Sequence, residues 1–585
     1  MGRALVLHAI CALVACGSPS LARHSAAEPS PRVGARTDSA DVATPTSVFT
    51  INDVTGGVAP WAVVLLRDVK TGAPLAMFLG DESGVVRVSA AAGPYDVSIA
   101  SPKGSLLRSA VVINGASLRF SLDTDCLLSA GVASGEVKEG DVVWARRQLD
   151  GAYFGAIVRD GGVFELCLSE GTYRLEPDGD LVSMATVFAP PARLALRAYG
   201  RGTVEAAAPD DGTALAAAGG LAEIVPPNAL LIGVGEPNHG ARECLQLRLT
   251  QSLDLARRLG VRYVALEAGA AEVFPLDDYV NGLDVDVVTA VSRLGYWMWD
   301  THEMLAVLDE LREFNLKAPA TGRVHLVGVD VQYSRRAAQY LLSELASTLS
   351  SIDRDALEVL AFVDDPAAAD VPQLLNVIEA LSLRTRSSTL RTALALEQVR
   401  QRLRMGLRGP SLEYMTREQG MATMALVLAR YLGGAKAVVW AHNSHVDFDA
   451  MSGVPSMGTF LRGSLGRRYV SVGVFVGAGR VRAWDADGTV GVIVHELPVP
   501  PIGSLERLLL ARLPKEVSFL NLQGLPAPLL EWLTVPRHAL EFGGAVHSAG
   551  AWPLRDFRAS FDAIAFVRAV SPTHPTASGE RRAAP

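Results

Sequence analysis

Four short apolar runs in the second half of this 585-residue chain each end in an acidic residue or a histidine. The runs are Leu230–Glu236, Tyr263–Glu267, Val324–Asp330 and Ala437–His442. Aliphatic runs of this length are too short for helices and are typical of strands buried on both faces of a parallel sheet. Because such sheets bind ligands beyond the carboxyl ends of their strands, polar residues placed there repeatedly predict an active site.

The composition is that of a globular protein with several domains. The chain is long enough for about two to four domains, and 49% of its residues are apolar. The net charge is −8, and no basic stripe with interleaved aromatic residues occurs. A nucleic-acid partner is therefore not expected.

The first residues have the features of an export signal. Arg3 precedes an apolar stretch, residues 4–15, that is too short to span a bilayer. The sequence Leu-Val-Ala-Cys16 resembles a bacterial lipobox, so we expect residues 1–16 to be a lipoprotein-type signal peptide and Cys16 to be lipidated. Because Gly17 is not the aspartate associated with inner-membrane retention, we expect an exported protein anchored by lipid to the outer membrane or surface of a Gram-negative bacterium. A plain cleaved signal is the alternative, and no other membrane contact is expected.

The number of cysteines does not predict a framework of several disulfide bonds. Cys11 would leave with the signal peptide, which leaves Cys126, Cys167 and Cys244 beside the lipidated Cys16. An oxidising compartment would allow Cys126 and Cys167 to pair, but the sequence does not show whether they face each other.

The region before the apolar runs is predicted to be all-β. Residues 17–46 lack large apolar groups and are expected to be a flexible tether. Residues 47–122 and 123–200 alternate apolar and polar residues between Gly, Pro and Asp turns, which predicts two β-sandwich modules. Residues 84–97 recur as 162–175, and the shared ending Gly-x-Tyr-x-aliphatic resembles carboxypeptidase-regulatory-like sandwiches. We expect a spacer or stalk, with glycan or protein contact as the alternative.

The second half alternates strand-length apolar runs with amphipathic stretches such as residues 242–259. This pattern predicts an α/β domain with a parallel-rich sheet over residues 222–575, after a linker at 201–221. Residues 356–432 have few strand formers and are predicted to be a helical insertion. The last residues, 576–585, are expected to be a disordered tail.

Several candidate site residues follow the predicted strands. Glu236 and His239 lie between a strand and a helix, where a carboxylate can orient an imidazole and raise its basicity, as a general base requires. Arg248 follows about two and a half helical turns later, and its guanidinium could bind a carboxylate or a developing oxyanion. The complete set of candidate catalytic residues is His239, Glu236, Glu267, Arg248, His442 and His445.

The order of these residues resembles the erythromycin esterase family. The family motif Gly-Glu-x-x-His-Gly matches residues 235–240, with its arginine at Arg248 and its next-strand glutamate at Glu267. The resemblance spans the α/β domain but not the β modules. Its further motifs match residues 296–303, 328–330, 440–446 and 561–564.

The resemblance implies a hydrolase that opens a macrolide lactone through attack of water on the ester carbonyl. It implies that His239 is the general base, that Glu236 orients it, and that Arg248 and Glu267 shape the polar site. No Gly-x-Ser-x-Gly nucleophile elbow occurs, which agrees with direct attack of water. The expected substrate is a small-molecule ester or macrolactone, and no cofactor is expected.

The resemblance also implies that His442 and His445 position water or stabilise the tetrahedral intermediate. Two residues depart from the family pattern. Asn238 stands where a small hydroxyl residue is usual and could change the polarity beside the base. Glu418 stands where the family often has aspartate, which we treat as conservative.

Two other functions fit the same residues. In the first, a divalent metal generates hydroxide by lowering the pKa of bound water. Its ligands would be Glu236, His239, Glu267, His442 and His445. In the second, the protein is a non-catalytic surface binder whose β modules and cleft hold a glycan or small molecule. Because every acidic and histidine position is intact, the sequence favours an enzyme.

Overall fold

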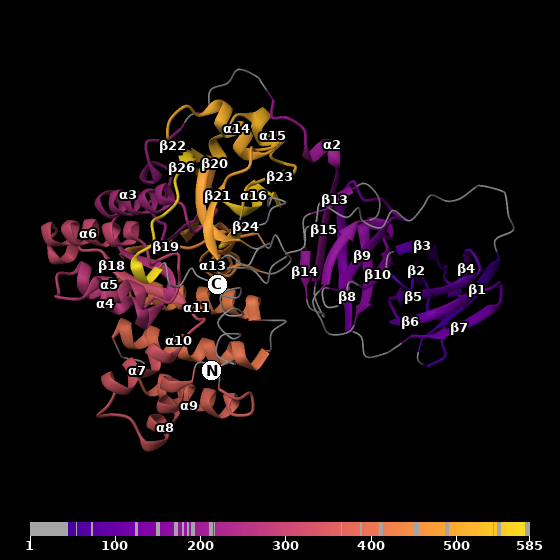
Figure 1. The fold of residues 1–585 in the computed structure, drawn as a ribbon, viewed down its shortest axis with the longest axis horizontal. Coiled ribbons are helices and arrows are strands. Elements are labelled where there is room, and N and C mark those ends of the chain that lie inside the picture. The colour runs from indigo at the N-terminus through magenta and orange to yellow at the C-terminus, as the bar shows by residue number, and fades with distance from the viewer. Residues whose placement is uncertain are drawn as a thin grey trace. The chain divides into compact units, whose positions relative to one another are not determined.

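The computed structural model divides into two compact units, one up to residue 206 and one from residue 207 (Figure 1). The residues predicted as a signal peptide, including Cys16, and most of those predicted as a tether lie outside the described residues. Among the described helices, none is both long and apolar enough to cross a bilayer. The described residues are 45–53, 55–71, 74–122, 127–147, 152–168, 173–177, 181–183, 186–188, 193–209, 215, 217–363, 366–385, 389–408, 413–449, 455–485, 491–541, 543–546 and 552–579.

The N-terminal unit is rich in strands, as predicted. Strands β1 to β7 span Thr46–Asn52, Val63–Arg67, Pro74–Leu79, Val85–Ser89, Gly93–Ser101, Gly104–Ile113 and Ser117–Ser121. Strands β8 to β15 span Leu127–Gly135, Val142–Arg147, Tyr153–Ile157, Val163–Leu168, Tyr173–Pro177, Leu181–Ser183, Thr186–Phe188 and Arg193–Gly200.

These strands form four sheets, and the strand orders of the two sheets in the first half are repeated in the two sheets of the second half. The orders are β4-β1-β7 and β3-β2-β5-β6 in the first half, and β11-β8-β15-β13 and β10-β9-β12-β14 in the second. The parallel pair β1–β7 has its counterpart in β8–β15. The sequence repeat therefore corresponds to a structural repeat, with β4 and β5 equivalent to β11 and β12. This arrangement is consistent with two β modules, whose role stays a prediction.

One cysteine of the N-terminal unit takes part in a disulfide bond. This residue is Cys167, whereas Cys126, the partner that the sequence offers, lies outside the described residues. In the second unit Cys244 is free and buried.

The second unit contains a parallel-rich sheet, as predicted. Its main order is β18-β17-β19-β16-β20-β26-β22, and along this order every neighbouring pair is parallel except β26 and β22. The four apolar runs thus form four adjacent strands. The long strand β20 also pairs antiparallel with β21 (Val492–Glu496) and parallel with β24 (Ala545–Val546). The bounds are Leu231–Val234 for β16, Val261–Gly269 for β17, His325–Asp330 for β18, Lys436–Trp440 for β19, Tyr469–Asp485 for β20, Val517–Asn521 for β22 and Ala563–Val570 for β26.

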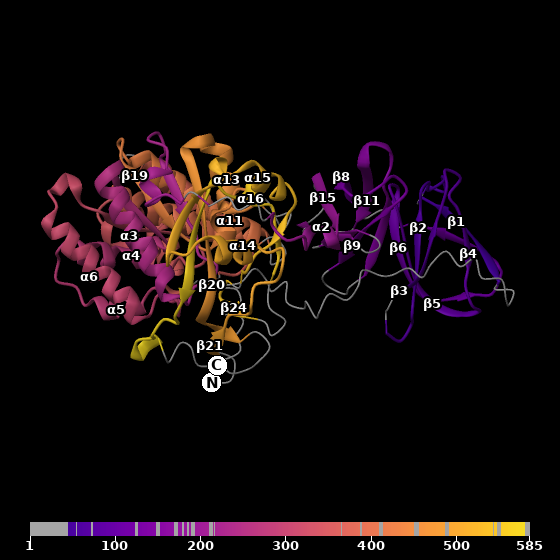
Figure 2. The ribbon, with the colours of Figure 1, turned by 90° about the horizontal axis from the view of Figure 1, so that it is seen from above.

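Helices cover both faces of this sheet (Figures 1 and 2). Successive strand residues point to opposite faces, so Leu231 and Val439 join one apolar core while Ile232 and Val438 join the other. Helices α3 (Arg242–Leu259) and α6 (His302–Lys317) pack in the second core, and most other helices pack in the first.

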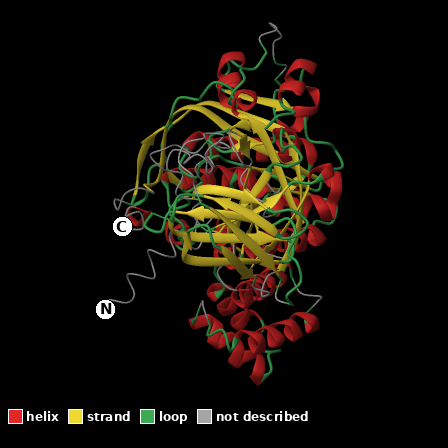
Figure 3. Cartoon of the chain, turned by 90° about the vertical axis from the view of Figure 1, so that its right-hand side faces the viewer, coloured by secondary structure: helices red, strands yellow, loops and turns green. Residues whose placement is uncertain are grey.

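A helical group extends the first core. It contains α7 (Arg335–Glu344), α8 (Ser351–Phe362), α9 (Val371–Arg384), α10 (Leu390–Arg408) and α11 (Glu413–Tyr431). These helices occupy the region predicted as a helical insertion, and part of the group is the red cluster at the bottom of Figure 3. The group leads directly into β19, and thus into the loop with His442 and His445.

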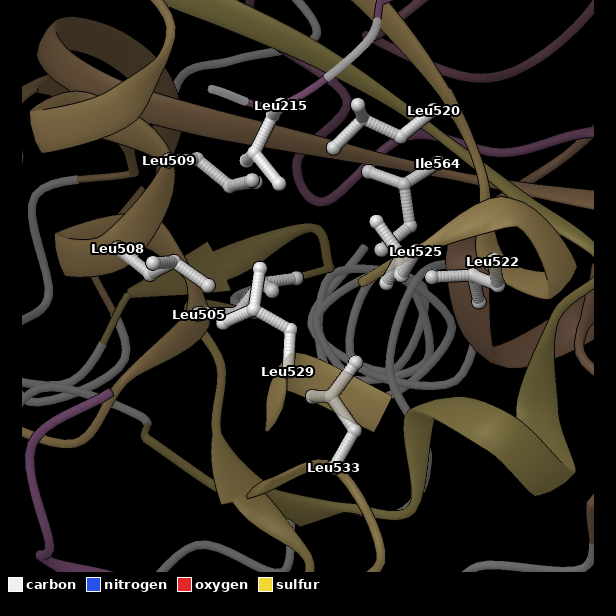
Figure 4. A pocket seen from close by; sticks show the side chains of 10 residues that line it. All are labelled: Leu215, Leu505, Leu508, Leu509, Leu520, Leu522, Leu525, Leu529, Leu533 and Ile564. Carbon is white, nitrogen blue, oxygen red and sulfur yellow. The ribbon is translucent and has the colours of Figure 1, made fainter. Parts of the chain in front are cut away.

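An apolar cluster packs beside β26 and the edge strand β22 (Figure 4). Leucines of α14 (Leu505–Arg512) and α15 (Ala527–Trp532) face Leu520 of β22 and Ile564 of β26 across a small cavity. Every residue that lines this cavity is leucine or isoleucine. We therefore regard it as part of the hydrophobic core.

The C-terminal tail differs from the prediction. Thr576 is buried, its hydroxyl donates to the carboxylate of Asp300, and Ser578 donates to the same oxygen at 3.0 Å. Residues 576–579 are thus packed, because the buried Asp300 carboxylate needs donors that the local sequence does not reveal. Residues 580–585 lie outside the described residues.

Candidate active site

The predicted site residues meet at one edge of the sheet. Because β16, β17, β18 and β19 are adjacent and parallel, their carboxyl ends share this edge. Glu236 and His442 lie two residues beyond the ends of β16 and β19, Glu267 lies two residues before the end of β17, and Asp330 ends β18. All four side chains are buried.

The motif 235–240 forms a tight turn between β16 and α3. A Cβ atom at Gly235 would lie 2.0 Å from Asn443 Oδ1, and one at Gly240 would lie 1.8 Å from the carbonyl oxygen of Arg482. Neither position has room for a side chain, so both glycines are required by close neighbours.

His239 and Glu236 form the central pair of the site. His239 Nδ1 lies 2.8 Å from Glu236 Oε1, and both side chains are buried. Because the carboxylate can only accept, Nδ1 is assigned a proton, and in the neutral ring Nε2 is then the nitrogen with the free lone pair. In the part of the chain that the structure describes, no group is hydrogen-bonded to Nε2. This nitrogen is therefore available to take a proton.

Arg248 binds the carboxylate oxygen of Glu236 that does not face His239. Arg248 Nη2 donates to Glu236 Oε2 at 2.5 Å. The guanidinium carbon lies 5.8 Å from the ring of Trp299 and 5.5 Å from that of Trp440, within cation–π range. Burial alone would raise the pKa of Glu236, but Arg248 and His239 hold it below its usual value. Glu236 is therefore ionised beside the base.

Glu267 accepts hydrogen bonds from the later part of the chain. Its Oε1 lies 3.0 Å from Arg417 Nη2 and 3.2 Å from His445 Nε2, and its Oε2 accepts from the backbone N–H of His442 at 3.0 Å. Burial would raise the pKa of Glu267, but His445, His239 and Arg417 hold it well below its usual value. This carboxylate organises the histidine loop.

Arg417, in α11, was not predicted as a site residue. It binds Asp330 through Nε at 3.1 Å and Nη2 at 2.9 Å, in addition to Glu267. Tyr296 donates a further hydrogen bond to Asp330 at 3.0 Å. Asp330 thus lies at the site as the anchor of Arg417. An arginine in a helix is usually solvated, so the sequence carried no signal for this contact.

His445 is held between two carboxylates. Its Nε2 faces Glu267, and its Nδ1 lies 2.6 Å from Glu418 Oε1. Burial would lower the pKa of His445, but Glu418 and Glu267 raise it to about 10. His445 is therefore an imidazolium at neutral pH, and both of its N–H groups face carboxylates.

His442 has the opposite charge state. Its Nδ1 accepts from the backbone N–H of Ser444 at 3.2 Å and lies 2.7 Å from Ser444 Oγ, while Nε2 lies 3.1 Å from the carbonyl oxygen of Pro237. Since a carbonyl only accepts, Nε2 is assigned the proton. Burial lowers the pKa of His442 to about 4, so the ring is neutral at physiological pH.

A late segment of the chain forms another wall that the sequence did not reveal. Glu541 Oε1 lies 3.4 Å from His442 Nδ1, and the other carboxylate oxygen binds Arg555. Arg555 also donates to Asp447 at 2.5 Å. Gly543 pairs its backbone with Asn238, beside the base. The contact between Gly543 and Asn238 joins residues 305 positions apart, for which no local sequence pattern exists.

The two departures from the family pattern have specific contacts. Asn238 Oδ1 accepts from the backbone N–H of Gly240 at 2.7 Å, and Nδ2 donates to the carbonyl of Gly543 at 3.2 Å. Asn238 therefore fixes the turn that carries His239. Glu418 also accepts from the backbone N–H of Met457 at 2.7 Å, which anchors it beside His445.

Metal binding was the alternative role for five of these residues. Among the described residues, no three His, Cys, Asp or Glu side chains converge in a geometry that could hold a metal ion. The carboxylates of Glu236 and Glu267 are each bound to a guanidinium group.

Comparisons with known proteins identify the family and the fold of the second unit. A family model described as erythromycin esterase matches residues 256–570. A succinoglycan biosynthesis protein of known structure has a TM-score of 0.55 and 18% identity, over 60% of this chain and 91% of that one. A protein from Bacillus cereus has a TM-score of 0.54 and 20% identity, over 61% and 92%. A mutant of the erythromycin esterase EreC in its open conformation has a TM-score of 0.45 and 17% identity, over 60% and 93%. The first two show a shared fold.

Proposed function

The chain belongs to the erythromycin esterase family, and we propose that it hydrolyses ester or lactone bonds with a water molecule activated by His239. As a member of this family it is a hydrolase related to esterases. The observation that carries the proposed mechanism is that Glu236 fixes His239 Nδ1 at 2.8 Å, while Nε2 has no hydrogen-bond partner among the described residues. A base oriented in this way is suited to proton abstraction near neutral pH.

In the proposed reaction, His239 Nε2 takes a proton from water while the water oxygen forms a bond to the ester carbonyl carbon. Glu236 stabilises the imidazolium that results, and Arg248 keeps Glu236 ionised. The proton then passes from His239 to the leaving oxygen as the carbon–oxygen bond breaks. A simple ester yields an acid and an alcohol, and a lactone yields one ring-opened hydroxy acid.

His442 is the donor that we assign to the developing oxyanion. Its ring centroid lies 5.4 Å from that of His239, so both rings can reach one carbonyl group. The Pro237 carbonyl that holds its Nε2–H also accepts from the backbone N–H of Gly543 at 3.3 Å. That carbonyl therefore keeps a partner when His442 turns to substrate. Once it has turned, a neutral N–H donor stabilises negative charge in a water-poor site.

His445 has a different role in this proposal from the one first expected. Because both of its N–H groups face carboxylates, it holds Glu267 in place and does not contact substrate. Since Glu236 and Glu267 are also engaged by arginines, the proposed reaction uses no metal. The substrate is a small-molecule ester, with a macrolactone as the class that the family suggests.

We further propose that the protein is exported and anchored through a lipid on Cys16. The support is the N-terminal sequence pattern alone. Labelling with a radioactive fatty acid in a Gram-negative host, with Cys16→Ala as the control, tests the anchor.

The enzymatic proposal is tested with the purified chain and a panel of macrolides and simple esters, followed by mass spectrometry. We expect a mass gain of one water for an opened lactone, and loss of that product in His239→Ala. Hydrolysis that persists at the wild-type rate in His239→Ala contradicts the proposed base. If no ester or lactone in the panel is hydrolysed, the proposed substrate class is wrong.

A further inference from the structure

A groove lies at the opposite end of the strands from the candidate active site. It has a volume of about 550 Å³ and is lined by residues of β17, β18, α4 (Ala270–Val280), α7 and α10. Tyr263 and His325 lie near the beginnings of β17 and β18, whereas Glu267 and Asp330 lie at the other ends. The groove is thus a separate place on the unit, with the size of a small-molecule site.

The walls of the groove are aromatic. The rings of Tyr263 and His325 lie 5.6 Å apart, and those of Phe274 and Tyr340 lie 4.9 Å apart. The guanidinium carbon of Arg391 lies 5.2 Å from the ring of Phe274. The face of one ring in this groove therefore already accommodates a cation.

The floor of the groove carries a fixed negative charge. Asp277 accepts from the backbone N–H of Leu326 at 3.0 Å and from Arg391 at 2.8 Å, and it lies 3.2 Å from His325 Nδ1. Burial would raise the pKa of Asp277, but hydrogen bonds from His325 and Arg391 hold it below its usual value. The carboxylate is therefore ionised and immobile.

Acidic groups outnumber cationic groups around this floor. Arg391 is shared by Asp277 and Asp278, which it binds at 2.8 and 2.6 Å. Glu344, at the end of α7, also lines the groove, and within the described residues it forms no ion pair. The charge of Arg391 is thus already matched by two carboxylates, and Glu344 adds a further acidic group to the lining, so the groove favours a positively charged ligand.

We propose that this groove binds a small organic cation, an amine or quaternary ammonium group. Its charge faces Glu344 and Asp277, and its carbon groups pack on the rings of Tyr263 and Tyr340. Aromatic walls combined with surplus carboxylates are the chemistry that recognises alkylammonium ions. This inference does not depend on the hydrolase activity, because the groove shares no residue with the site around His239.

Choline and its neutral carbon isostere, 3,3-dimethylbutan-1-ol, provide a matched pair of probes. Each is titrated into the full-length chain by isothermal calorimetry or ligand-observed NMR. We expect saturable binding of choline with one site per chain, and binding at least tenfold weaker for the neutral isostere. Equal affinity for the two probes, or no binding of choline, overturns the proposal.

Substitutions at exposed or half-buried positions locate the site without endangering the fold. Glu344→Gln should weaken choline binding by about two- to fivefold, as expected for one solvent-exposed charge. Tyr340→Leu should weaken it by about tenfold, while Tyr340→Phe keeps the ring and the affinity. Glu379→Gln removes an exposed carboxylate that pairs with Arg404 on the helical group, and it should leave choline binding unchanged. Unchanged binding in both Glu344→Gln and Tyr340→Leu overturns the proposed location.

Discussion

The imidazole rings of His442 and His445 lie 6.3 Å apart, yet their environments drive their pKa values in opposite directions. His442 is buried beside a carbonyl and a serine, which favours the neutral ring, whereas His445 lies between two carboxylates, which favours the imidazolium. Two histidines on one turn of chain therefore have different chemistry, a donor in one case and a fixed cation in the other.

This difference predicts how stability depends on pH. The folded pKa of His445 is raised from 6.5 to about 10, so its contribution is complete below pH 6.5 and is lost as the pH rises through 10. The pKa of His442 is lowered to about 4, so its contribution is present above pH 6.5 and is lost as the pH falls through 4. The pH dependence of the melting temperature of the wild type and of His445→Asn, followed from pH 4 to 10, measures the alkaline loss assigned to His445 and the acid loss assigned to His442. The variant should show a flatter decline on the alkaline side, and an unchanged alkaline slope contradicts the assigned charge of His445.

Glu236→Gln removes the carboxylate charge between His239 and Arg248. We expect kcat to fall by roughly a hundredfold, because the base loses its orienting charge. We also expect the free energy of unfolding to fall by about 3–5 kcal/mol, because a buried guanidinium is left unpaired. Steady-state kinetics and urea denaturation measure the two effects. Glu243→Gln, on the helix that carries Arg248 but in a partly exposed pair with Arg242, is the control and should be nearly neutral. Equal effects of the two variants would mean that the Glu236 charge has no special role.

Arg417→Lys tests the hub that joins Asp330 to Glu267. Lysine has no planar fork and loses the paired contacts with Asp330, so we expect a loss of stability of about 2–4 kcal/mol and reduced kcat. Arg404→Lys, in a half-exposed pair with Glu379, is the matched control and should change stability by less than about 1 kcal/mol. Chemical denaturation of both variants measures the difference, and a neutral Arg417→Lys would show that these contacts are dispensable.

Gly240→Ala tests the tight turn behind the base. The added Cβ would meet the backbone of Arg482, so the turn must shift, and we expect lower thermal stability together with a large loss of kcat. Gly463→Ala, in α13 (Met457–Leu465), meets no atom within 4 Å and should stabilise the helix by about 0.5–1 kcal/mol. If the two substitutions behaved alike, the close approach at Gly240 would be wrong.

Chelation separates the proposed mechanism from the metal alternative. Because arginines engage both glutamates of the site, treatment with EDTA or 1,10-phenanthroline should leave the hydrolytic rate unchanged. Loss of activity that zinc or manganese restores would establish the metal-dependent reaction instead.

Much of this site was predictable because it depends on strand ends. The short apolar runs before Glu236, Glu267 and His442 identify buried parallel strands, and parallel strands place their ends at one edge. No such rule exists for Arg417 in the last helix of the helical group, or for Glu541 in a late loop. Their partners lie 150 and 99 positions away, counted from Glu267 and His442, and only the packed fold determines those contacts.

The charge states of His442 and His445 could not be predicted from the sequence either. His442 and His445 belong to the same short motif, and nothing in their spacing separates a neutral ring from a cation. The distinction arises from Glu418 and from the Pro237 carbonyl, which tertiary structure brings to the two rings. The packed tail at Thr576 is a similar case, since its partner Asp300 lies far away in the chain.

The parallel pairing of the first and last strands in each N-terminal module has a consequence for growth by duplication. Since β1 and β7 point the same way, as do β8 and β15, the polypeptide enters a module at one pole and departs at the other. Copies of such a unit can be concatenated through short connections without doubling back. The two copies in this chain are also joined by packing, because Val63 and Leu65 share one apolar cluster with Val142, Trp144 and Tyr153.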